Sequence, residues 1–351
     1  MLENQSALAV VPKAKAIAAR RLTKEDYAEL ERKRSVLEVT AALQSHPYFA
    51  DSLKGLSSMN LHRAQIEEAL RKDIFYKYES LMHYTFDKKG SFGTYFLMRC
   101  EITELLAKIR LLSMGFRHHY IVQLPGFLAS KTSFSLLKLA KAETIEECVP
   151  VVAGTPYAKV LAAVMPPKGK LPDYLLCEHA FWNYYYVTVV RQIERSVPGR
   201  IKADTKRLFL QQAEIYNLDL LYRAKAFYNE QLPPAKLREL LLNVTYILPQ
   251  KKLYELAGAR DLKEFLRLYN DSRARKVYGE RTDELDKPSD IEADRALYHS
   301  AERLLHFSCT PQTVLAATLC LADIQRSNII NIIEGVRYGL PAAQINTFLK
   351  Y

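Results

Sequence analysis

The sequence has few glycines and none of the short motifs that mark common catalytic and cofactor sites. Only 12 of its 351 residues are glycine, about half the usual share. Nucleotide-binding α/β enzymes and all-β sandwiches need glycine for phosphate loops and tight turns, so this composition disfavours both. No GxGxxG, HExxH or CxxC occurs, and no glycine-rich loop ends in Gly-Lys-Ser/Thr. We therefore expect no cofactor, no bound metal and no small-molecule substrate.

Long hydrophobic runs and a regular cysteine framework are also missing. The longest apolar run, from Val314 to Ala322, is half the ~18 residues that a membrane span requires. Residues 1–15 lack the continuous apolar stretch of a signal peptide. The cysteines are odd in number and stand among apolar neighbours, which is typical of buried, reduced thiols in an intracellular protein. They are Cys100, Cys148, Cys177, Cys309 and Cys320.

The sequence does carry a moderate positive charge. Its 50 Lys and Arg against 39 Asp and Glu give a net charge of +11. This balance first suggests nucleic acid or an acidic surface as a partner. The excess is spread, however, as +5 over residues 1–125, +5 over 126–250 and +1 over 251–351. We therefore expect solvated helix faces and no phosphate site, even at the densest cluster (Arg195, Arg200, Lys202, Lys206 and Arg207).

Apolar residues recur every three or four positions almost throughout, which predicts an all-α protein. Long helices are expected over 60–82, 91–115, 171–195, 201–230 and 310–339. Asn60, Ser91 and Thr310 are candidate helix caps, and Thr144 with Glu147 has a capping-box pattern. The charge-rich stretch 278–289 is expected to be the most mobile loop.

A polar pattern recurs near the end of three expected helices. In each copy a Glu or Gln precedes an Asn or Glu by three residues, an aliphatic residue follows, and a charged residue stands six positions later. The sets are Glu101, Glu104 and Arg110; Glu214, Asn217 and Arg223; and Gln325, Asn328 and Glu334. The copies are 113 and 111 residues apart, and Pro47-Tyr48 and Pro156-Tyr157 return at an offset of 109. This predicts three helical units, over residues 1–125, 126–250 and 251–351.

The repeated pattern is interpreted as structural. Residues three positions apart lie on one helical face, where Glu and Asn can bind a neighbouring helix end or carbonyl. A catalytic role would require the same chemistry three times. We therefore treat the nine residues as structural or interface candidates.

Other reactive residues are also interpreted as structural. His118-His119 has no nearby Cys or carboxylate, so an exposed pair is expected and not a metal site. The successive residues Cys177, Glu178 and His179 point in different directions on a helix. Glu67-Glu68 is expected to be a pair of helix-surface carboxylates.

The aromatic residues allow two interpretations. The run Phe181-Trp-Asn-Tyr-Tyr-Tyr186 covers all sides of a helix. With Arg191 and Arg195 downstream, it could form a stacking platform for single-stranded nucleic acid. A helix buried on several sides has the same composition and is the commoner case.

Three stretches together resemble a known family. They are the opening (Ala14-Lys-Ala-Ile17, Leu22-Thr-Lys-Glu-Asp-Tyr27 and Ser35-Val-Leu-Glu-Val39), the middle helix (Glu214-Ile-Tyr-Asn-Leu218) and the late helix (Asn328-Ile-Ile-Asn-Ile-Ile-Glu-Gly335). With the threefold pattern, the chain resembles the C subunits of the V-type/A-type ATPases, which are equivalent to the d subunit of the eukaryotic enzyme. The late helix is similar to the Glu-x-x-Asn-Ile-x-x-Ile pattern of the family's third repeat, with Gln325 replacing the first Glu. Glu104 stands where Asn is usual, and Lys108 where an aliphatic residue is expected.

The resemblance implies a funnel of three similar helical domains around a pseudo-threefold axis. Such a family member is a non-catalytic central-stalk adapter that receives the tip of the shaft (the D and F subunits) and sits on the membrane rotor ring. It transmits torque for proton or sodium transport and lies peripherally on the cytoplasmic face of the complex. Two alternatives stay open here: a basic helical-repeat protein that binds nucleic acid, and an unrecognised all-α enzyme.

Overall fold

The computed structural model describes residues 2–56, 63–85, 91–197, 199, 201–283 and 291–351. Within these ranges the chain is helical and contains no β-strand, as the apolar periodicity predicted. The α-helices are α1 (Leu2–Ala19), α2 (Lys24–Glu31), α3 (Val36–Ser45), α4 (Arg63–Met82), α5 (Tyr95–Ser113), α6 (Leu136–Lys141), α7 (Ile145–Val151), α8 (Tyr157–Ala163), α9 (Tyr174–Ser196), α10 (Ile201–Phe227), α11 (Pro234–Glu239), α12 (Gln250–Ala257), α13 (Leu262–Asn270), α14 (Ala274–Tyr278), α15 (Ile291–Phe307), α16 (Pro311–Arg337) and α17 (Ala342–Thr347).

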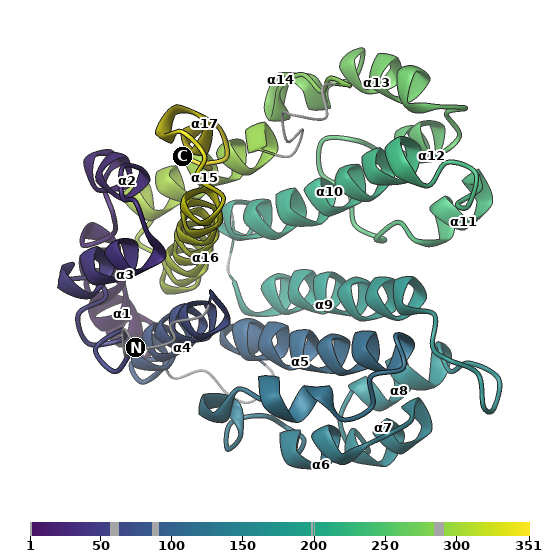
Figure 1. Cartoon of the computed structure of the whole chain (residues 1–351), viewed down its shortest axis with the longest axis horizontal. Helices are drawn as coiled ribbons and strands as arrows, with labels where there is room; N and C mark the ends of the chain where they lie inside the picture. Colours follow the sequence, from purple (N-terminus) through teal and green to yellow (C-terminus); the bar gives the residue numbers. More distant parts are fainter. Residues whose placement is uncertain (1, 57–62, 86–90, 198, 200, 284–290) are drawn as a thin grey trace.

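Six long helices contact one another in a closed cyclic order. α4 packs on α5, where the rings of Tyr78 and Phe96 are 5.1 Å apart between centroids. From there α5 contacts α9, α9 contacts α10, α10 contacts α15, α15 contacts α16, and α16 returns to α4. Figure 1 shows α5, α9 and α10 lying side by side, with α16 and α4 on the other side of the molecule. The polar pattern lies on every second helix of this order, namely α5, α10 and α16.

Shorter helices flank each of these three helices on the outside. In Figure 1, α6–α8 lie below α5, α11 and α12 lie at the outer end of α10, and α13 and α14 lie above α10. The corresponding neighbours of α16 are α2 and α3, which contact it directly although they precede it by more than 260 residues. The backbone N–H of Leu22 donates to the side chain of Gln325, 303 residues later (2.8 Å).

The buried apolar residues form two cores. The larger one unites α4, α5, α9, α10, α15 and the first half of α16. The smaller one joins early residues to the second half of α16 and the segment after it. Its members are Tyr27, Leu30, Val39, Leu43, Tyr48, Phe49, Leu53, Ile66, Leu70, Ile329, Ile330, Ile332, Ile333, Val336, Ile345 and Leu349. Segments from opposite ends of the described chain therefore share one hydrophobic interior.

One helix start is repeated around the molecule. α3, α7 and α13 begin after Ser35, Thr144 and Asp261, whose side chains accept the N–H of Glu38, Glu147 and Glu264 (3.2, 3.3 and 2.8 Å). Each glutamate in turn accepts the N–H of the residue before the cap (2.9, 2.8 and 2.8 Å). This arrangement satisfies two otherwise unpaired N–H groups at each start. The prediction for Thr144 is confirmed, and the structure adds two matching cases.

The long helices confirm most of the predicted boundaries. α4 buries Ile66, Leu70, Ile74, Tyr78 and Leu81, whereas its expected cap Asn60 lies outside the described residues. Gly115 and Gly339 follow α5 and α16 with φ of +80° and +68°, a conformation that glycine adopts without strain. Ser91 and Thr310 make no side-chain cap bond. Ser91 precedes a short 3-10 turn, Phe92–Thr94, and α5 begins only after it.

One expectation about burial was wrong, and the stretch expected to be a mobile loop contains one deeply buried residue. Cys309 is exposed because it lies in the short connection between α15 and α16, whereas Cys148, Cys177 and Cys320 are buried. Arg281, in the stretch expected to be a mobile loop, is 1% exposed. Its guanidinium pairs with Asp219 of α10 (Nη2···Oδ1 2.5 Å), which holds this loop against the helix.

Candidate functional site: a polar seam and a central hollow

In the first copy of the polar pattern, buried side chains of α5 hydrogen-bond a loop region that follows this helix. We call the buried polar contacts of each copy a seam. Glu101 is buried, and its carboxylate accepts hydrogen bonds from the backbone N–H of Ser133 and from the hydroxyl of Tyr157 (2.5 Å). Glu104 is also buried and accepts from the hydroxyl of Tyr120 (2.8 Å). Bonds to an ionised carboxylate are stronger than neutral ones, so these two residues hold segment 120–157 on the helix.

The second copy does the same on α10. Both oxygens of the buried Glu214 accept backbone N–H groups from residues 246–248, at 2.7–3.4 Å. The hydroxyl of Tyr278 donates to the same carboxylate (2.8 Å). Asn217 bonds both the N–H and the C=O of Leu242 (2.8 and 3.3 Å). Burial and the charge of Glu214 together raise the pKa of Tyr278, so its hydroxyl stays protonated as the donor.

The third copy, on α16, has the same framework with fewer bonds. Gln325 accepts the N–H of Leu22 (2.8 Å), and Asn328 accepts the N–H of Lys350 (2.9 Å). Tyr48 is the counterpart of Tyr157 in the repeated Pro-Tyr dipeptide. Within the described part of the chain, its buried hydroxyl and the Nε2 of Gln325 have no hydrogen-bond partner. The third copy of the pattern therefore makes fewer polar contacts than the first two.

The charged ends of the three copies differ from their buried centres. Arg110 and Arg223 are exposed on α5 and α10. The positive charges of both act on the same carboxylate, Glu178 of α9, the helix between α5 and α10. Burial raises the pKa of Glu178, and the two arginines oppose this shift without cancelling it. Glu334 is partly buried and pairs with Arg63 of α4 (3.3 Å). Arg110, Arg223 and Glu334 therefore lie outside the buried contacts that the other six pattern residues make.

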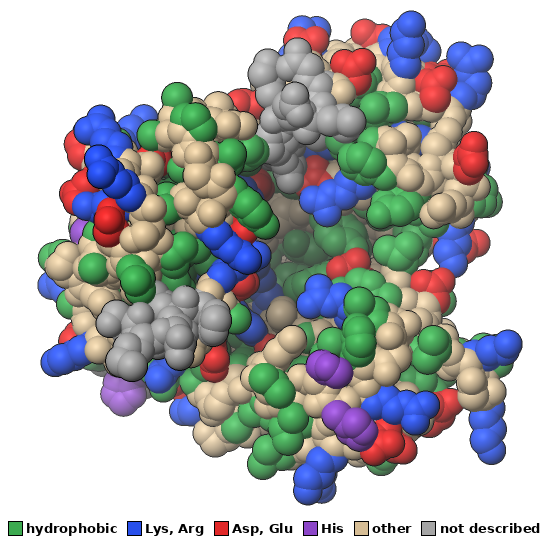
Figure 2. Space-filling view, viewed as in Figure 1, with side chains coloured by type: hydrophobic (Ala, Val, Ile, Leu, Met, Phe, Trp, Pro, Cys, Tyr) green, Lys and Arg blue, Asp and Glu red, His purple; other side chains and the backbone are tan. Residues whose placement is uncertain are grey.

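The six long helices surround a hollow, visible as a depression in the middle of Figure 2. It consists of two adjoining pockets of about 300 and 340 Å³ that share Arg99, Asp323 and Arg326. α4, α5 and α16 line the first pocket, and α9, α10, α15 and α16 line the second. All six helices therefore contribute to the hollow.

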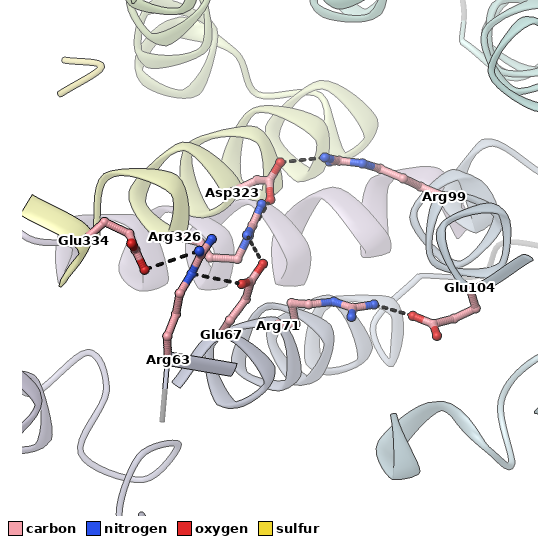
Figure 3. Close-up of polar contacts among 8 residues, drawn as sticks. All are labelled: Arg63, Glu67, Arg71, Arg99, Glu104, Asp323, Arg326 and Glu334. Atoms are coloured by element: carbon pink, nitrogen blue, oxygen red, sulfur yellow. Dashed lines mark hydrogen bonds and ion pairs between the residues drawn. The ribbon is translucent and has the colours of Figure 1, made fainter. Parts of the chain in front are cut away.

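A chain of ion pairs crosses the hollow between helices that are far apart in sequence (Figure 3). Arg99 of α5 donates to Asp323 of α16 (2.6 Å), and Arg326 bonds the other oxygen of Asp323 (3.0 Å). Arg326 also reaches Glu67 of α4 (3.5 Å). Burial alone would raise the pKa of Asp323, but the two arginine charges outweigh it and lower the pKa well below its usual value. The carboxylate is therefore ionised at neutral pH.

The network continues along α4 at both ends. Arg63 pairs with Glu334 (3.3 Å) and approaches Glu67 (3.8 Å), while Arg71 pairs with the seam residue Glu104 (Figure 3). Glu68 is exposed, as expected, and Glu67 keeps 36% of its side-chain surface exposed while it pairs with Arg326. The network joins α4, α5 and α16 through charged side chains on one wall of the hollow.

The aromatic run on α9 packs into the protein. Phe181, Tyr185 and Tyr186 are buried, and Trp182 lies edge-on to Tyr185 (5.6 Å between ring centroids). Trp182 also lines the second pocket of the hollow. Rings that pack on one another cannot stack on successive bases, so this run is a core element and not the platform of the nucleic-acid hypothesis.

The remaining candidate groups show no catalytic arrangement. His118 and His119 are exposed, as predicted, but the expectation that no carboxylate lies nearby was wrong, since Nε2 of His118 is 3.9 Å from Glu143. Cys177 is buried, and His179 donates from Nδ1 to the backbone oxygen of Leu240 (2.8 Å). Across the described ranges, no group of three or more His, Cys, Asp and Glu is placed to hold a metal ion. Every helix in those ranges is too short or too polar to cross a membrane.

The structure is that of an all-helical protein in which six long helices surround a charged hollow. A family model described as "ATP synthase (C/AC39) subunit" matches residues 10–348. The chain belongs to this family. It is also 25% identical over 171 residues to the C subunit of the A-type ATP synthase of Methanosphaera stadtmanae. That match covers 47% of this chain and 42% of the relative, so it spans less than half the length of that protein.

Proposed function

We propose that this chain is the non-catalytic adapter of a V/A-type rotary ATPase, between the central shaft (the D and F subunits) and the membrane rotor ring. The central hollow is the socket for the shaft tip, and the family membership supports this role. The observation that carries the proposal is the ion-paired wall shared by α4, α5 and α16. The chain then lies peripherally on the cytoplasmic face of the membrane complex and transmits torque for proton or sodium transport.

The chemistry of the hollow suits a protein occupant. Its side chains alternate in charge, with Arg99 and Arg326 held beside Asp323 and Glu67. The side chains of Arg99 and Asp323 keep 33% and 27% of their surface exposed, so they can still contact a partner. Fixed charges of both signs favour one orientation of that partner and add to specificity more than to affinity.

The same ion pairs give a route for mechanical load. A force on α5 at Arg99 passes to α16 through Asp323, and from there to α4 through Arg326 and Glu67. Buried carboxylates in the seams then connect α5 and α10 to their outer helices. Glu101 and Glu214 are occupied by these bonds, which supports a structural role for them and not a catalytic one.

We also propose that the molecule is a funnel of three units around a pseudo-threefold axis. The grouping favoured by the contacts is α4–α5 with α6–α8, α9–α10 with α11–α14, and α15–α16 with α2–α3. It keeps the predicted threefold pattern but moves the predicted bounds of 1–125, 126–250 and 251–351. The first two units become residues 63–163 and 174–278, and the third, 291–337, is completed by residues 22–53 from earlier in the sequence. The repeated caps, seams and cyclic helix order support this grouping.

Site-specific crosslinking tests the socket. Ser327 lines the second pocket, and Lys159 on the outer helix α8 is exposed and far along the chain from it. In a Cys309→Ser background, which removes the exposed native thiol, Ser327→Cys and Lys159→Cys are each labelled with a photoreactive maleimide. We expect shaft subunits to crosslink to residue 327 and not to residue 159 in the assembled complex. Equal crosslinking at both positions, or none at residue 327, would contradict the proposal.

A further inference from the structure

Each helix that carries the polar pattern ends in a large apolar side chain exposed to solvent. Met114, Phe227 and Tyr338 each stand ten residues after the Glu or Asn that forms the second position of the pattern. They are 62%, 58% and 70% exposed. Core packing does not explain residues that lie outside the core, yet the same position is apolar in all three copies. We call them the three tip residues.

The helix ends themselves do not require these side chains. α5 and α16 end alike: the residue after a positive-φ glycine (Gly115 or Gly339) donates to the carbonyl five residues earlier, at 2.8 and 2.9 Å. In this motif the apolar contact belongs to the residue after the glycine. Met114 and Tyr338 precede the glycines, so the motif gives no reason for them to be large and apolar.

Arginine accompanies each tip residue. Arg110 and Arg223 lie one helical turn before Met114 and Phe227, and the guanidinium of Arg337 lies 5.7 Å from the ring centroid of Tyr338. An exposed apolar group beside arginine is typical of protein interfaces, where both residue types are enriched. The matching partner segments would be apolar and acidic.

The three tips are suited to one broad partner. Points related by a threefold rotation lie on one circle around the axis, at one level along it. Arg110 lines the hollow, whereas Met114 lies one turn further out along α5. A shaft narrow enough to enter the hollow therefore meets Arg99 and Arg326, while only a wider partner reaches three helix ends together.

We propose that Met114, Phe227 and Tyr338 form a three-point docking surface for a ring of identical subunits that presents short, acidic and apolar loops. This inference rests on the proposed function and assigns the rotor ring to one set of residues. It also separates the two partners in space, with the shaft in the hollow and the ring on the surrounding helix ends.

Copurification from gently solubilised membranes tests this surface. The tagged full-length chain is compared with Met114→Ser/Phe227→Ser/Tyr338→Ser, and ring and shaft subunits are quantified separately. The matched control is Leu137→Ser/Ile201→Ser/Phe307→Ser, three exposed apolar residues that are not tip residues (58%, 39% and 76% exposed); Ile201 lies at the opposite end of α10 from Phe227. We expect ring recovery to fall about tenfold or more in the tip variant, with shaft recovery unchanged in both variants. Each single tip substitution should give a partial loss.

The possible outcomes distinguish a failure of the docking surface from a failure of the proposed adapter function. Undiminished ring recovery in the tip variant, or loss of the shaft with the ring retained, overturns the docking surface and leaves the adapter role standing. An equal loss in the control variant also overturns it, because the effect would not be specific to the tips. A wild-type chain that recovers neither shaft nor ring overturns both proposals. Thermal unfolding of each variant, expected to match wild type, verifies that the fold is intact.

Discussion

Tyr278 donates its hydroxyl hydrogen bond to Glu214, a buried carboxylate 64 residues earlier (2.8 Å). Tyr157 makes the same bond to Glu101 (2.5 Å). In the third copy, Tyr48 has no such acceptor because Gln325 replaces the glutamate. Two of the three seams therefore close with a bond to a charged group, and the third does not.

Removing these hydroxyl groups should have unequal effects. Tyr157→Phe and Tyr278→Phe are each expected to lower the free energy of unfolding by about 1–3 kcal/mol, because a buried carboxylate loses a donor. Tyr48→Phe should change it by less than about 0.5 kcal/mol, since its hydroxyl has no partner to lose. Urea denaturation at pH 7 measures all three. An equally large cost for Tyr48→Phe would show that its hydroxyl is bonded in solution.

The ion pair between Arg99 and Asp323 in the hollow predicts a pH-dependent effect on stability. The pKa of Asp323 is lower in the folded protein than its ordinary 3.8. Its stabilising contribution is therefore complete above pH 3.8 and is lost as the pH falls toward the folded value. Asp323→Asn should lower the free energy of unfolding at pH 7 by about 1–3 kcal/mol.

Urea titrations at pH 7, 5 and 3.5 measure this difference. It should be the same at pH 7 and 5, and smaller at pH 3.5. A difference that grew as the pH fell would contradict the assignment. Glu255→Gln, an exposed carboxylate on α12, is the control for a general loss of negative charge.

A half-buried histidine predicts a second pH effect, near neutrality. Burial lowers the pKa of His179 below its ordinary 6.5, and the bond to Leu240 only partly opposes this. The unfolded chain takes up a proton at pH values where the folded chain does not, so stability falls as the pH drops through 6.5. His179→Gln should lose less stability than wild type between pH 7.5 and pH 5.5. The exposed His83→Gln should behave like wild type, and an unchanged slope in His179→Gln would refute the argument.

The glycine after Glu334 should not tolerate a side chain. A Cβ on Gly335 would lie 2.6 Å from Cγ1 of Ile345, so α16 could not keep its present distance from α17. Gly335→Ala is expected to lower the free energy of unfolding by roughly 1–3 kcal/mol through overpacking, despite the better helix propensity of alanine.

The double variant Gly335→Ala/Ile345→Ala gives an internal check by calorimetry or urea denaturation. Its total cost should be less than the sum of the two single costs, because the second change removes the clashing atoms. Gly55→Ala, where a Cβ has no atom within 4 Å, should be close to wild type. Additive costs would mean that α17 moves aside without strain.

The sequence predicted the parts of the fold that depend on local pattern. Helical periodicity identified α9, α10 and α16, and the three-residue spacing of the seam identified residues that prove to be buried and bonded. Lys108, noted as a departure from the family, is also buried, and its ammonium donates to the carbonyls of Arg117 and Ala140 (2.8 and 3.2 Å).

The hollow could not be predicted in the same way. Arg99 and Asp323 are 224 residues apart, and each stands in an ordinary mixed-charge helix. Nothing in the spacing within either helix indicates that the two face each other. The pairing of α2 and α3 with α16 was missed for the same reason, since repeat offsets show that segments are alike and not which ones touch.

The smaller core also bears on synthesis at the ribosome. Val39 and Leu43 are made early, but Ile329 and Ile333, which share their core, come about 300 residues later. At 5–20 residues per second, that interval is roughly 15–60 s. During that time α5 and α10 can join their own outer helices, while the first-made apolar faces remain uncovered. The apolar faces of α2 and α3 are thus completed only late in synthesis, and we expect them to depend on chaperones.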